Sequence, residues 1–133
     1  MIDFIPSIKI KFYFAGYEFD LDQVTSRLGI VPDVARTRDD WPTKHYVETI
    51  WAIEIEEYNC IAISLLFEKL LAIIKSKGAI IRDICSDCDA EVGFVIVAHY
   101  QDGSKPELTL TREIISFAAS INAEIGFDIY CYE

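Results

Sequence analysis

The chain has 133 residues and a formal net charge of −10, from 22 acidic and 12 basic side chains. This length fits one domain with a core of its own, and a hydrophobic fraction of 52% excludes a disordered chain. A negative field of this size repels nucleic-acid phosphates and anionic lipid. It therefore disfavours nucleic-acid binding and favours a basic protein partner.

The sequence has no segment typical of secretion or membrane insertion. Its start lacks the basic region and apolar core of a signal peptide. The longest apolar stretch, residues 61–74, is interrupted by polar side chains and is too short to span a bilayer. We therefore expect a cytoplasmic protein with no membrane contact, whose four cysteines are thiols.

The first elements along the chain are a strand and a short helix. Residues 8–15 alternate apolar and polar side chains, which predicts a half-buried strand. Asp20 can then cap a helix, and Gly29 stands where a left-handed residue would end it. The side chains at helical spacing between them are Leu21, Val24, Thr25 and Leu28.

The next part of the chain begins with the longest irregular segment, residues 31–46, which carries mixed charges and prolines. Loops of this length in compact domains are often functional. A strand over about residues 47–58 follows, and then a helix over about residues 61–77 that Gly78 is expected to end. The apolar face of this helix consists of Ile63, Leu66, Phe67, Leu70 and Ile74.

The last part predicts two strands, residues 79–85 and 91–100, joined by a polar turn at 86–89. A helix over about residues 111–122 and a closing strand at 124–132 follow. The order β-α-β-α-β-β-α-β predicts a single α+β domain over residues 1–133, with a mostly antiparallel sheet of about five strands and three helices. A short pattern leads into both the first and the third helix (Glu18-Phe19-Asp20-Leu21-Asp22 and Glu107-Leu108-Thr109-Leu110-Thr111). This repeat favours two related β-α-β units, which would be ferredoxin-like.

Several of these motifs together resemble a known family. They are Phe19-Asp20-Leu21-Asp22 with Thr25, Leu28-Gly29-Ile30-Val31-Pro32, Trp51 on the next strand, and the ending Ile121-Asn122-Ala123-Glu124-Ile125-Gly126-Phe127-Asp128-Ile129-Tyr130. In this order they resemble the bacterial domain of unknown function 4279 family, over nearly the whole chain. The resemblance implies a fold and gives no catalytic residues to carry over.

Two groups of side chains could in principle hold a metal. Cys85 and Cys88 form one C-x-x-C, and the other thiols and imidazoles (Cys60, Cys131, His45, His99) are scattered. On a turn beside carboxylates these thiols would have a raised pKa, which is unsuited to a redox pair. The acidic group Asp83, Asp87, Asp89 and Glu91 lacks the spacing of a calcium loop, so a solvated acidic hairpin is the simpler interpretation. We expect neither a metal nor a cofactor.

No nucleophile motif and no phosphate-binding loop occurs in the sequence. Glu54 and Glu56 share one strand face and could in principle form a carboxylate pair for acid–base chemistry, but a solvent-facing edge or sheet surface is the favoured interpretation. The sequence therefore favours a protein without catalytic residues.

The segment 33–45 is the best candidate for a binding site. It groups arginines with a tryptophan, which are the residue types that anchor protein interfaces. The candidate partner-binding residues are Arg36, Arg38, Trp41, Lys44 and His45. In the alternative interpretation, Trp41 packs on the core and the cations pair with neighbouring aspartates.

Three functions remain open. The first is a non-enzymatic protein-binding module of immunity or antitoxin type, which would neutralise a basic toxin by electrostatic complementarity. The second is a small-molecule sensor or enzyme that holds an anionic ligand between sheet and helices with Arg36, Arg38 and Tyr46. The third is a homo-oligomeric structural domain that associates through Leu65 and the sheet edge.

Overall fold

The computed structural model describes residues 4–40 and 48–133. In chain order the elements are β1 (Ser7–Gly16), α1 (Leu21–Leu28), β2 (Val34–Arg36), the 3-10 turn η1 (Arg38–Asp40), β3 (Thr49–Tyr58), α2 (Ile63–Ile74), the 3-10 turn η2 (Lys75–Lys77), α3 (Gly78–Cys88), β4 (Glu91–Gln101), α4 (Arg112–Ser120) and β5 (Glu124–Tyr132). No helix among the described residues is both long and apolar enough to cross a membrane.

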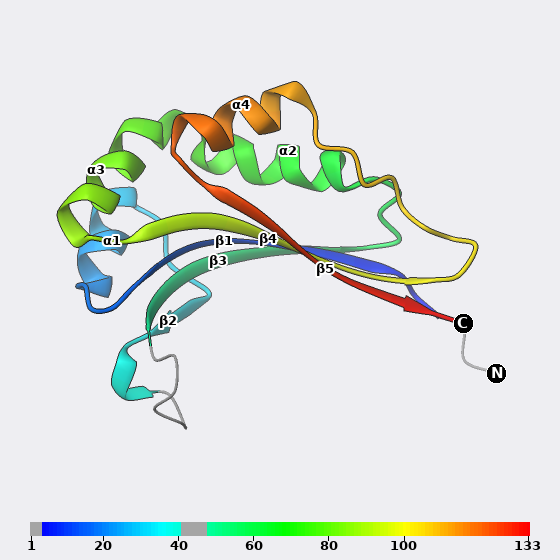
Figure 1. Ribbon diagram of the computed structural model, residues 1–133, viewed down its shortest axis with the longest axis horizontal. Coiled ribbons are helices and arrows are strands. Elements are labelled where there is room, and N and C mark those ends of the chain that lie inside the picture. Colours follow the sequence, from blue (N-terminus) through cyan, green and yellow to red (C-terminus); the bar gives the residue numbers. More distant parts are fainter. Residues whose placement is uncertain (1–3, 41–47) are drawn as a thin grey trace.

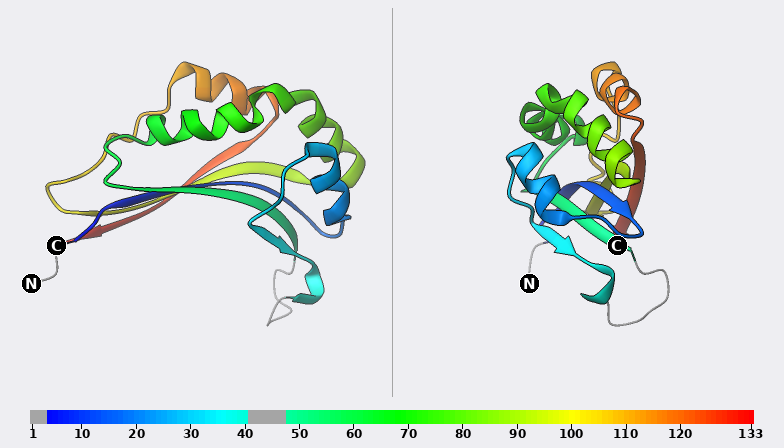
Figure 2. Two further views of the ribbon diagram at one scale, coloured as in Figure 1. Left: turned by 180° about the vertical axis from the view of Figure 1, so that it is seen from behind. Right: turned by 90° about the vertical axis from the view of Figure 1, so that its left-hand side faces the viewer.

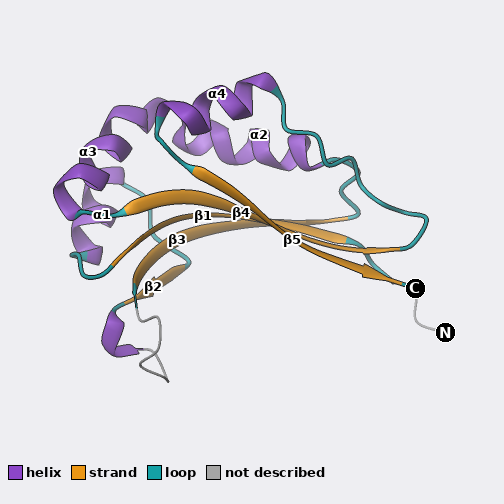
Figure 3. Cartoon of the chain, in the orientation of Figure 1, coloured by secondary structure: helices purple, strands orange, loops and turns teal. Residues whose placement is uncertain are grey.

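The strands form one sheet in the order β2-β3-β1-β4-β5. Every neighbouring pair is antiparallel except β4 and β5, which are parallel. Within the described residues, α1 to α4 all lie on one side of this sheet (Figures 1 and 3). β2 and η1 descend on the opposite side, at the end where α1 and α3 lie (Figure 2). The predicted single-sheet α+β class with five strands, mostly antiparallel, is confirmed.

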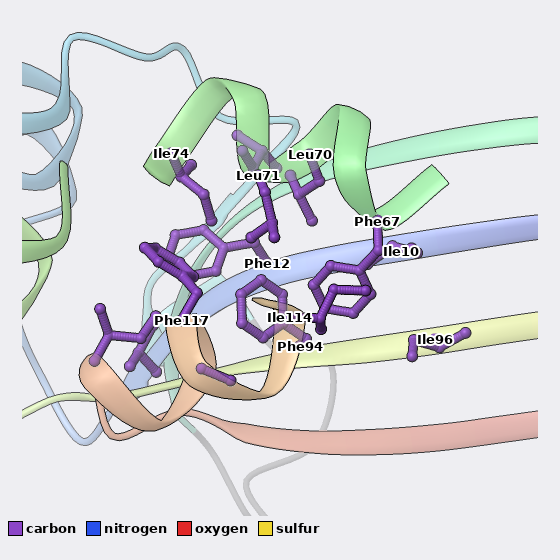
Figure 4. Packing of buried hydrophobic residues seen from close by; sticks show 14 of the residues in the cluster. Ile10, Phe12, Phe67, Leu70, Leu71, Ile74, Phe94, Ile96, Ile114 and Phe117 are labelled. Atoms are coloured by element: carbon purple, nitrogen blue, oxygen red, sulfur yellow. The ribbon is translucent and has the colours of Figure 1, made fainter. Parts of the chain in front are cut away.

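The core lies between the sheet and its helices. Alternate side chains of β1 are buried beneath the helices (Ile8, Ile10, Phe12 and Phe14). Phe94 of β4 lies at the centre, with ring centroids 5.2 Å from Phe12 and 4.9 Å from Phe67 of α2. Figure 4 shows side chains of α2 and α4 meeting those of the central strands there. Each such aromatic pair adds about 0.5–1.5 kcal/mol to the free energy from apolar burial.

The predicted ends of the first helix are confirmed. The Asp20 carboxylate accepts hydrogen bonds from the backbone N–H groups of Asp22 (3.0 Å) and Gln23 (3.4 Å), so it caps α1. Gly29 ends the helix with φ of 69°, where a residue without a side chain is least strained. The three expected helices correspond to α1, α2 and α4, and the expected strands at 8–15, 91–100 and 124–132 to β1, β4 and β5.

The expected strand at residues 79–85 is wrong, because this segment is helix α3. Gly78 was expected to end a helix, yet its φ of −54° and ψ of −44° make it the first residue of a new one. This new helix, α3, ends at Asp89, which has the left-handed φ of 52°. The spacing of Ile81, Ile84, Cys85 and Cys88 is helical, and both isoleucines are buried. The predicted hairpin turn at 86–89 is therefore the end of α3.

The fifth strand comes from the segment expected to be irregular. β2 pairs with β3 through three residues, Val34–Arg36. The two repeated sequence patterns also lead to different strand arrangements. β1 and β2, on either side of α1, run parallel but are separated in the sheet by β3, whereas β4 and β5, on either side of α4, are parallel and adjacent. Only the second unit pairs its two strands directly.

Candidate functional site

The sheet face opposite the α-helices, here called the open face, presents the alternate side chains that the core does not use. Ion pairs cross its middle. The Lys9 ammonium lies 3.8 Å from the Glu54 carboxylate and 3.7 Å from that of Glu56, and Lys11 lies 3.7 Å from Glu54. Each carboxylate therefore faces a lysine on β1, which is the arrangement of a solvated sheet surface. Pairs this exposed each contribute about 0–1 kcal/mol to stability.

One end of the open face, here called the Tyr13 site, gathers carboxylates around Tyr13. Its other members are Gly93, Glu48, Glu91 and Glu124. Register places Tyr13 beside Gly93, and Gly93 beside Glu124. Partial burial raises the pKa of the Tyr13 hydroxyl, and the charges of Glu124, Glu91 and Glu48 raise it further. The site is thus a tyrosine ring inside a negative field.

The lack of a side chain at Gly93 makes room for the tyrosine. A Cβ built at Gly93 would lie 2.4 Å from the Tyr13 hydroxyl oxygen and 2.7 Å from the adjacent ring carbon. The hydroxyl end of the ring consequently lies directly over the backbone at Gly93. A cavity of about 440 Å³ lies at the start of β4 and β5 and shares Glu91 and Glu124 with the site. Its lining residues are Cys85, Ala90, Glu91, Val92, Ile121, Asn122, Ala123 and Glu124.

The segment β2–η1 lies at the same end of the sheet as the Tyr13 site (Figures 1 and 2). Two aspartates hold its backbone. The Asp33 carboxylate accepts a 2.7 Å hydrogen bond from the Glu54 backbone N–H. Asp40 accepts from the backbone N–H (2.8 Å) and hydroxyl (3.0 Å) of Thr37. The hydrogen bonds from Thr37, together with the charge of Arg36, lower the pKa of the Asp40 carboxyl.

Arg38 connects this segment to the turn after β1. Its guanidinium carbon lies 3.6 Å from the centre of the Tyr17 ring, which is a cation–π contact. Its Nε is buried and has no hydrogen-bond partner among the described residues. A cavity of about 170 Å³ lies beside it. The cavity is lined by Glu18, Phe19, Thr37, Arg38, Asp39 and Thr49.

The structure describes two of the five predicted partner-binding residues. Arg36 and Arg38 both lie at the β2–η1 end of the molecule. Trp41, Lys44 and His45 lie outside the described residues, so their part in the site stays a prediction. The alternative interpretation of the sequence paired the cations of this segment with neighbouring aspartates. One such interaction is seen, because the charge of Arg36 contributes to lowering the pKa of Asp40.

The C-x-x-C lies in the last turn of α3, not on a turn between strands. Burial, with a contribution from the neighbouring Cys88, raises the pKa of Cys85 to about 11. The pKa of Cys88 is also raised, mainly by burial, and Arg27 opposes this shift. Raised pKa values suit unreactive thiols. Among the described residues no group of three or more His, Cys, Asp or Glu side chains is placed to hold a metal ion.

The Tyr13 site was not predicted from the sequence. One signal for it was available, because a glycine inside a strand marks a close approach of another group to the backbone. Gly93 is such a glycine, the third residue of β4 and followed there by a run of apolar residues. The tyrosine that approaches it lies eighty positions earlier, and only the strand register connects the two.

The chain belongs to the family described as Domain of unknown function (DUF4279), whose model matches residues 6–132. The match covers nearly the whole chain and so confirms the resemblance of its motifs to that family. A comparison with curated proteins and with solved structures finds no match.

Proposed function

We propose that this chain is a non-enzymatic protein-binding module of immunity or antitoxin type, whose partner is basic. The observation that carries this proposal is the Tyr13 site, with three carboxylates around one aromatic ring on a sheet face free of α-helices within the described residues. A lysine or arginine of a partner can lie on such a ring and pair with the carboxylates around it.

The charge of the whole chain supports the same partner. A net charge of −10 accelerates the approach of a cationic protein and slows that of an anionic one. The Tyr13 site adds local geometry to this general attraction, because it concentrates negative charge at one end of one face. Speed of capture is what an immunity protein requires if it is to neutralise a toxin before the toxin acts.

The β2–η1 segment supplies the second half of the proposed contact. Arg38 is held by Tyr17, and Asp33 and Asp40 hold the backbone on either side of it. A segment that is ordered before binding loses less conformational entropy when a partner arrives. We include Trp41 in the proposed contact as an apolar anchor, following its position in the sequence next to η1.

An anionic small molecule is the weaker alternative. The orphaned Nε of Arg38 would favour an anion, but Glu18 and Asp39 line the same cavity and repel one. The volume of about 170 Å³ is also below the roughly 300–1,000 Å³ usual for ligand pockets. A rise in melting temperature on addition of one metabolite from an anionic panel, absent in Arg38→Ala, would support this alternative instead.

The test is a matched pair of charge reversals. The tagged protein is used to capture partners from a lysate of its native host, and the captured protein is then titrated in purified form. Glu91→Lys with Glu124→Lys reverses two charges at the Tyr13 site. The control pair, Glu68→Lys with Asp83→Lys, changes the net charge by the same amount. Its two residues are exposed on α2 and α3, on the side of the sheet opposite the open face.

We expect the site pair to reduce the association rate by about tenfold or more and the helix pair to reduce it much less. Trp41→Ala and Arg38→Ala, with unchanged melting temperatures, should weaken binding by about thirtyfold for a central anchor. Equal effects of the two charge-reversal pairs would refute the Tyr13 site. Wild-type affinity in the Trp41 and Arg38 variants would remove the β2–η1 segment from the contact.

A further inference from the structure

The two edges of the sheet differ. At one edge, β2 has three residues and includes Arg36. At the other, β5 runs for nine residues in unbroken parallel register with β4, from Glu124 beside Gly93 to Tyr132 beside Gln101. Nine residues of strand expose an edge roughly 30 Å long. Every second backbone N–H and C=O along such an edge points away from the sheet.

Sheet proteins usually protect an edge of this kind. The usual devices are a lysine or proline on the strand, a bulge, or a very short strand. β2 is protected by its shortness. β5 contains neither lysine nor proline, and its register shows no bulge. An unprotected edge in a natural domain is a place where a further strand can add.

The side chains of β5 would give such a strand apolar contacts on both faces. Phe127 and Ile129 stand beside the core residues Ile96 and Ala98 in register, yet they are 45% and 38% exposed. On the open face Tyr130 and Tyr132 are 42% and 43% exposed. Tyr130 is held in place by stacking on His99, with ring centroids 4.6 Å apart. Rigid, half-exposed aromatic side chains are typical of contact surfaces.

Charge identifies the chemistry of the added strand. After Arg112 the chain carries no lysine or arginine, and its charged residues there are Glu113, Glu124, Asp128 and Glu133. Two of these lie on β5 itself. A second copy of the chain would bring the same carboxylates to the edge, in a molecule that also carries a net charge of −10. An extended segment rich in lysine or arginine would meet opposite charge.

We propose that the outer edge of β5, which no strand among the described residues covers, binds an extended segment of another protein, in which basic and apolar side chains alternate, as a sixth strand of the sheet. Backbone hydrogen bonds to β5 supply the affinity. Contacts with Phe127 and Ile129 on the helix side of the sheet supply the preference for apolar side chains. On the open face, Asp128 with Tyr130 and Tyr132 supplies the preference for basic ones. The inference goes beyond the proposed function, because it concerns the strand edge and stands without the Tyr13 site.

The probe is a synthetic peptide of about eight residues in which lysine and valine alternate, capped at both ends. Two control peptides have the same length. One alternates glutamate and valine, and the other replaces central valines of the lysine peptide with proline, which removes backbone donors and keeps the charge. Amide hydrogen exchange of the full chain, followed by NMR, measures protection residue by residue.

We expect the lysine–valine peptide to slow exchange of β5 amides, with neither control doing so. Phe127→Lys and Ile129→Lys place lysines on the edge strand, which disfavour the addition of another strand. Each should reduce the affinity for the lysine–valine peptide by about tenfold or more. Ile115→Lys, an apolar residue of α4 that is 52% exposed, is the matched control and should leave binding unchanged.

Three outcomes would overturn the proposal. They are equal binding of the proline peptide, peptide-induced protection that spares β5, and a free protein that is already dimeric with its β5 amides protected. The wild-type exchange experiment decides the matter even if a lysine variant fails to fold. Failure here leaves the Tyr13 site untouched, since the charge reversals of that site are measured with a captured protein partner and this test with a synthetic peptide on the β5 amides.

Discussion

The indole N–H of Trp51 donates a 2.9 Å hydrogen bond to the hydroxyl of Thr25, which ties β3 to α1 across the core. Thr25 in turn donates to the Leu21 carbonyl one helical turn earlier, at 3.3 Å. Trp51 is fully buried, and the edge of its ring meets Phe14 with centroids 5.7 Å apart. Both partners of the bond are among the residues through which the sequence resembles its family, and the bond gives them a shared structural role.

Thr25→Val should therefore destabilise the protein by about 1–3 kcal/mol, because it leaves the buried indole N–H without an acceptor in a side chain of nearly the same shape. Thr25→Ser keeps the hydroxyl and is the matched control, with an expected cost of less than about 1 kcal/mol. Urea unfolding followed by tryptophan fluorescence measures both. Equal costs for valine and serine would mean that the hydrogen bond contributes little.

Asp20→Ala should lower the free energy of unfolding by about 1 kcal/mol, because α1 loses the acceptor of two N-terminal backbone N–H groups. Asp22→Ala is the control, since Asp22 lies in the same turn and interacts with the helix dipole without capping. Its expected cost is a few tenths of a kcal/mol. Thermal and urea unfolding of the two variants compare them directly, and a cost for Asp20→Ala below the error of measurement would remove the capping role.

Gly93→Ala should force the Tyr13 ring off the backbone of β4, because the new Cβ cannot share space with it. In the wild-type background we expect a loss of about 1–3 kcal/mol, as for other overpacked sites. In a Tyr13→Ala background the same change should cost about 1 kcal/mol less, or even stabilise the strand. A double-mutant cycle by chemical unfolding gives this coupling energy. A coupling energy of zero would show that the Tyr13 ring does not contribute to the cost of the new side chain at position 93.

Stability should fall between pH 9 and pH 11 in a way that depends on Cys85. Its pKa is raised from 9.0 to about 11 in the folded protein, so over this range the thiol ionises in the unfolded chain and stays neutral in the folded one. The stabilisation is complete below the unfolded pKa and is lost as pH rises toward the folded one. Cys85→Ala should flatten this part of the pH profile of urea unfolding. Identical slopes for the two proteins would contradict the shift.

The elements that could be predicted from the sequence are those with local and unambiguous signals. β1 and β5 alternate apolar and polar side chains or sit between clear turns, and α1 has a cap at Asp20 and a left-handed glycine at its end. α3 has no such signal. Its run of small and β-branched residues after Gly78 favours a strand locally, and the burial of Ile81 and Ile84 decides for a helix.

The candidate site depended on contacts that no local pattern contains. Arg38 could be recognised as an interface residue type, but its stacking partner Tyr17 belongs to the turn after β1. The carboxylates Glu91 and Glu124 reach Tyr13 only because β4 lies between β1 and β5. The sequence therefore indicated which residue types could bind a partner. It did not indicate which residues contact one another, because that depends on the order of the strands in the sheet.

The central position of β1 also bears on how the chain assembles as the ribosome makes it. β1 emerges first among the strands, yet its two neighbours are β3 and β4, so its second neighbour is complete only at Gln101. Until then one backbone edge of β1 has no partner strand, and an unpaired edge of this kind makes a nascent chain prone to aggregation. The last step is local, because α4 and β5 follow directly and add to a sheet that is already built.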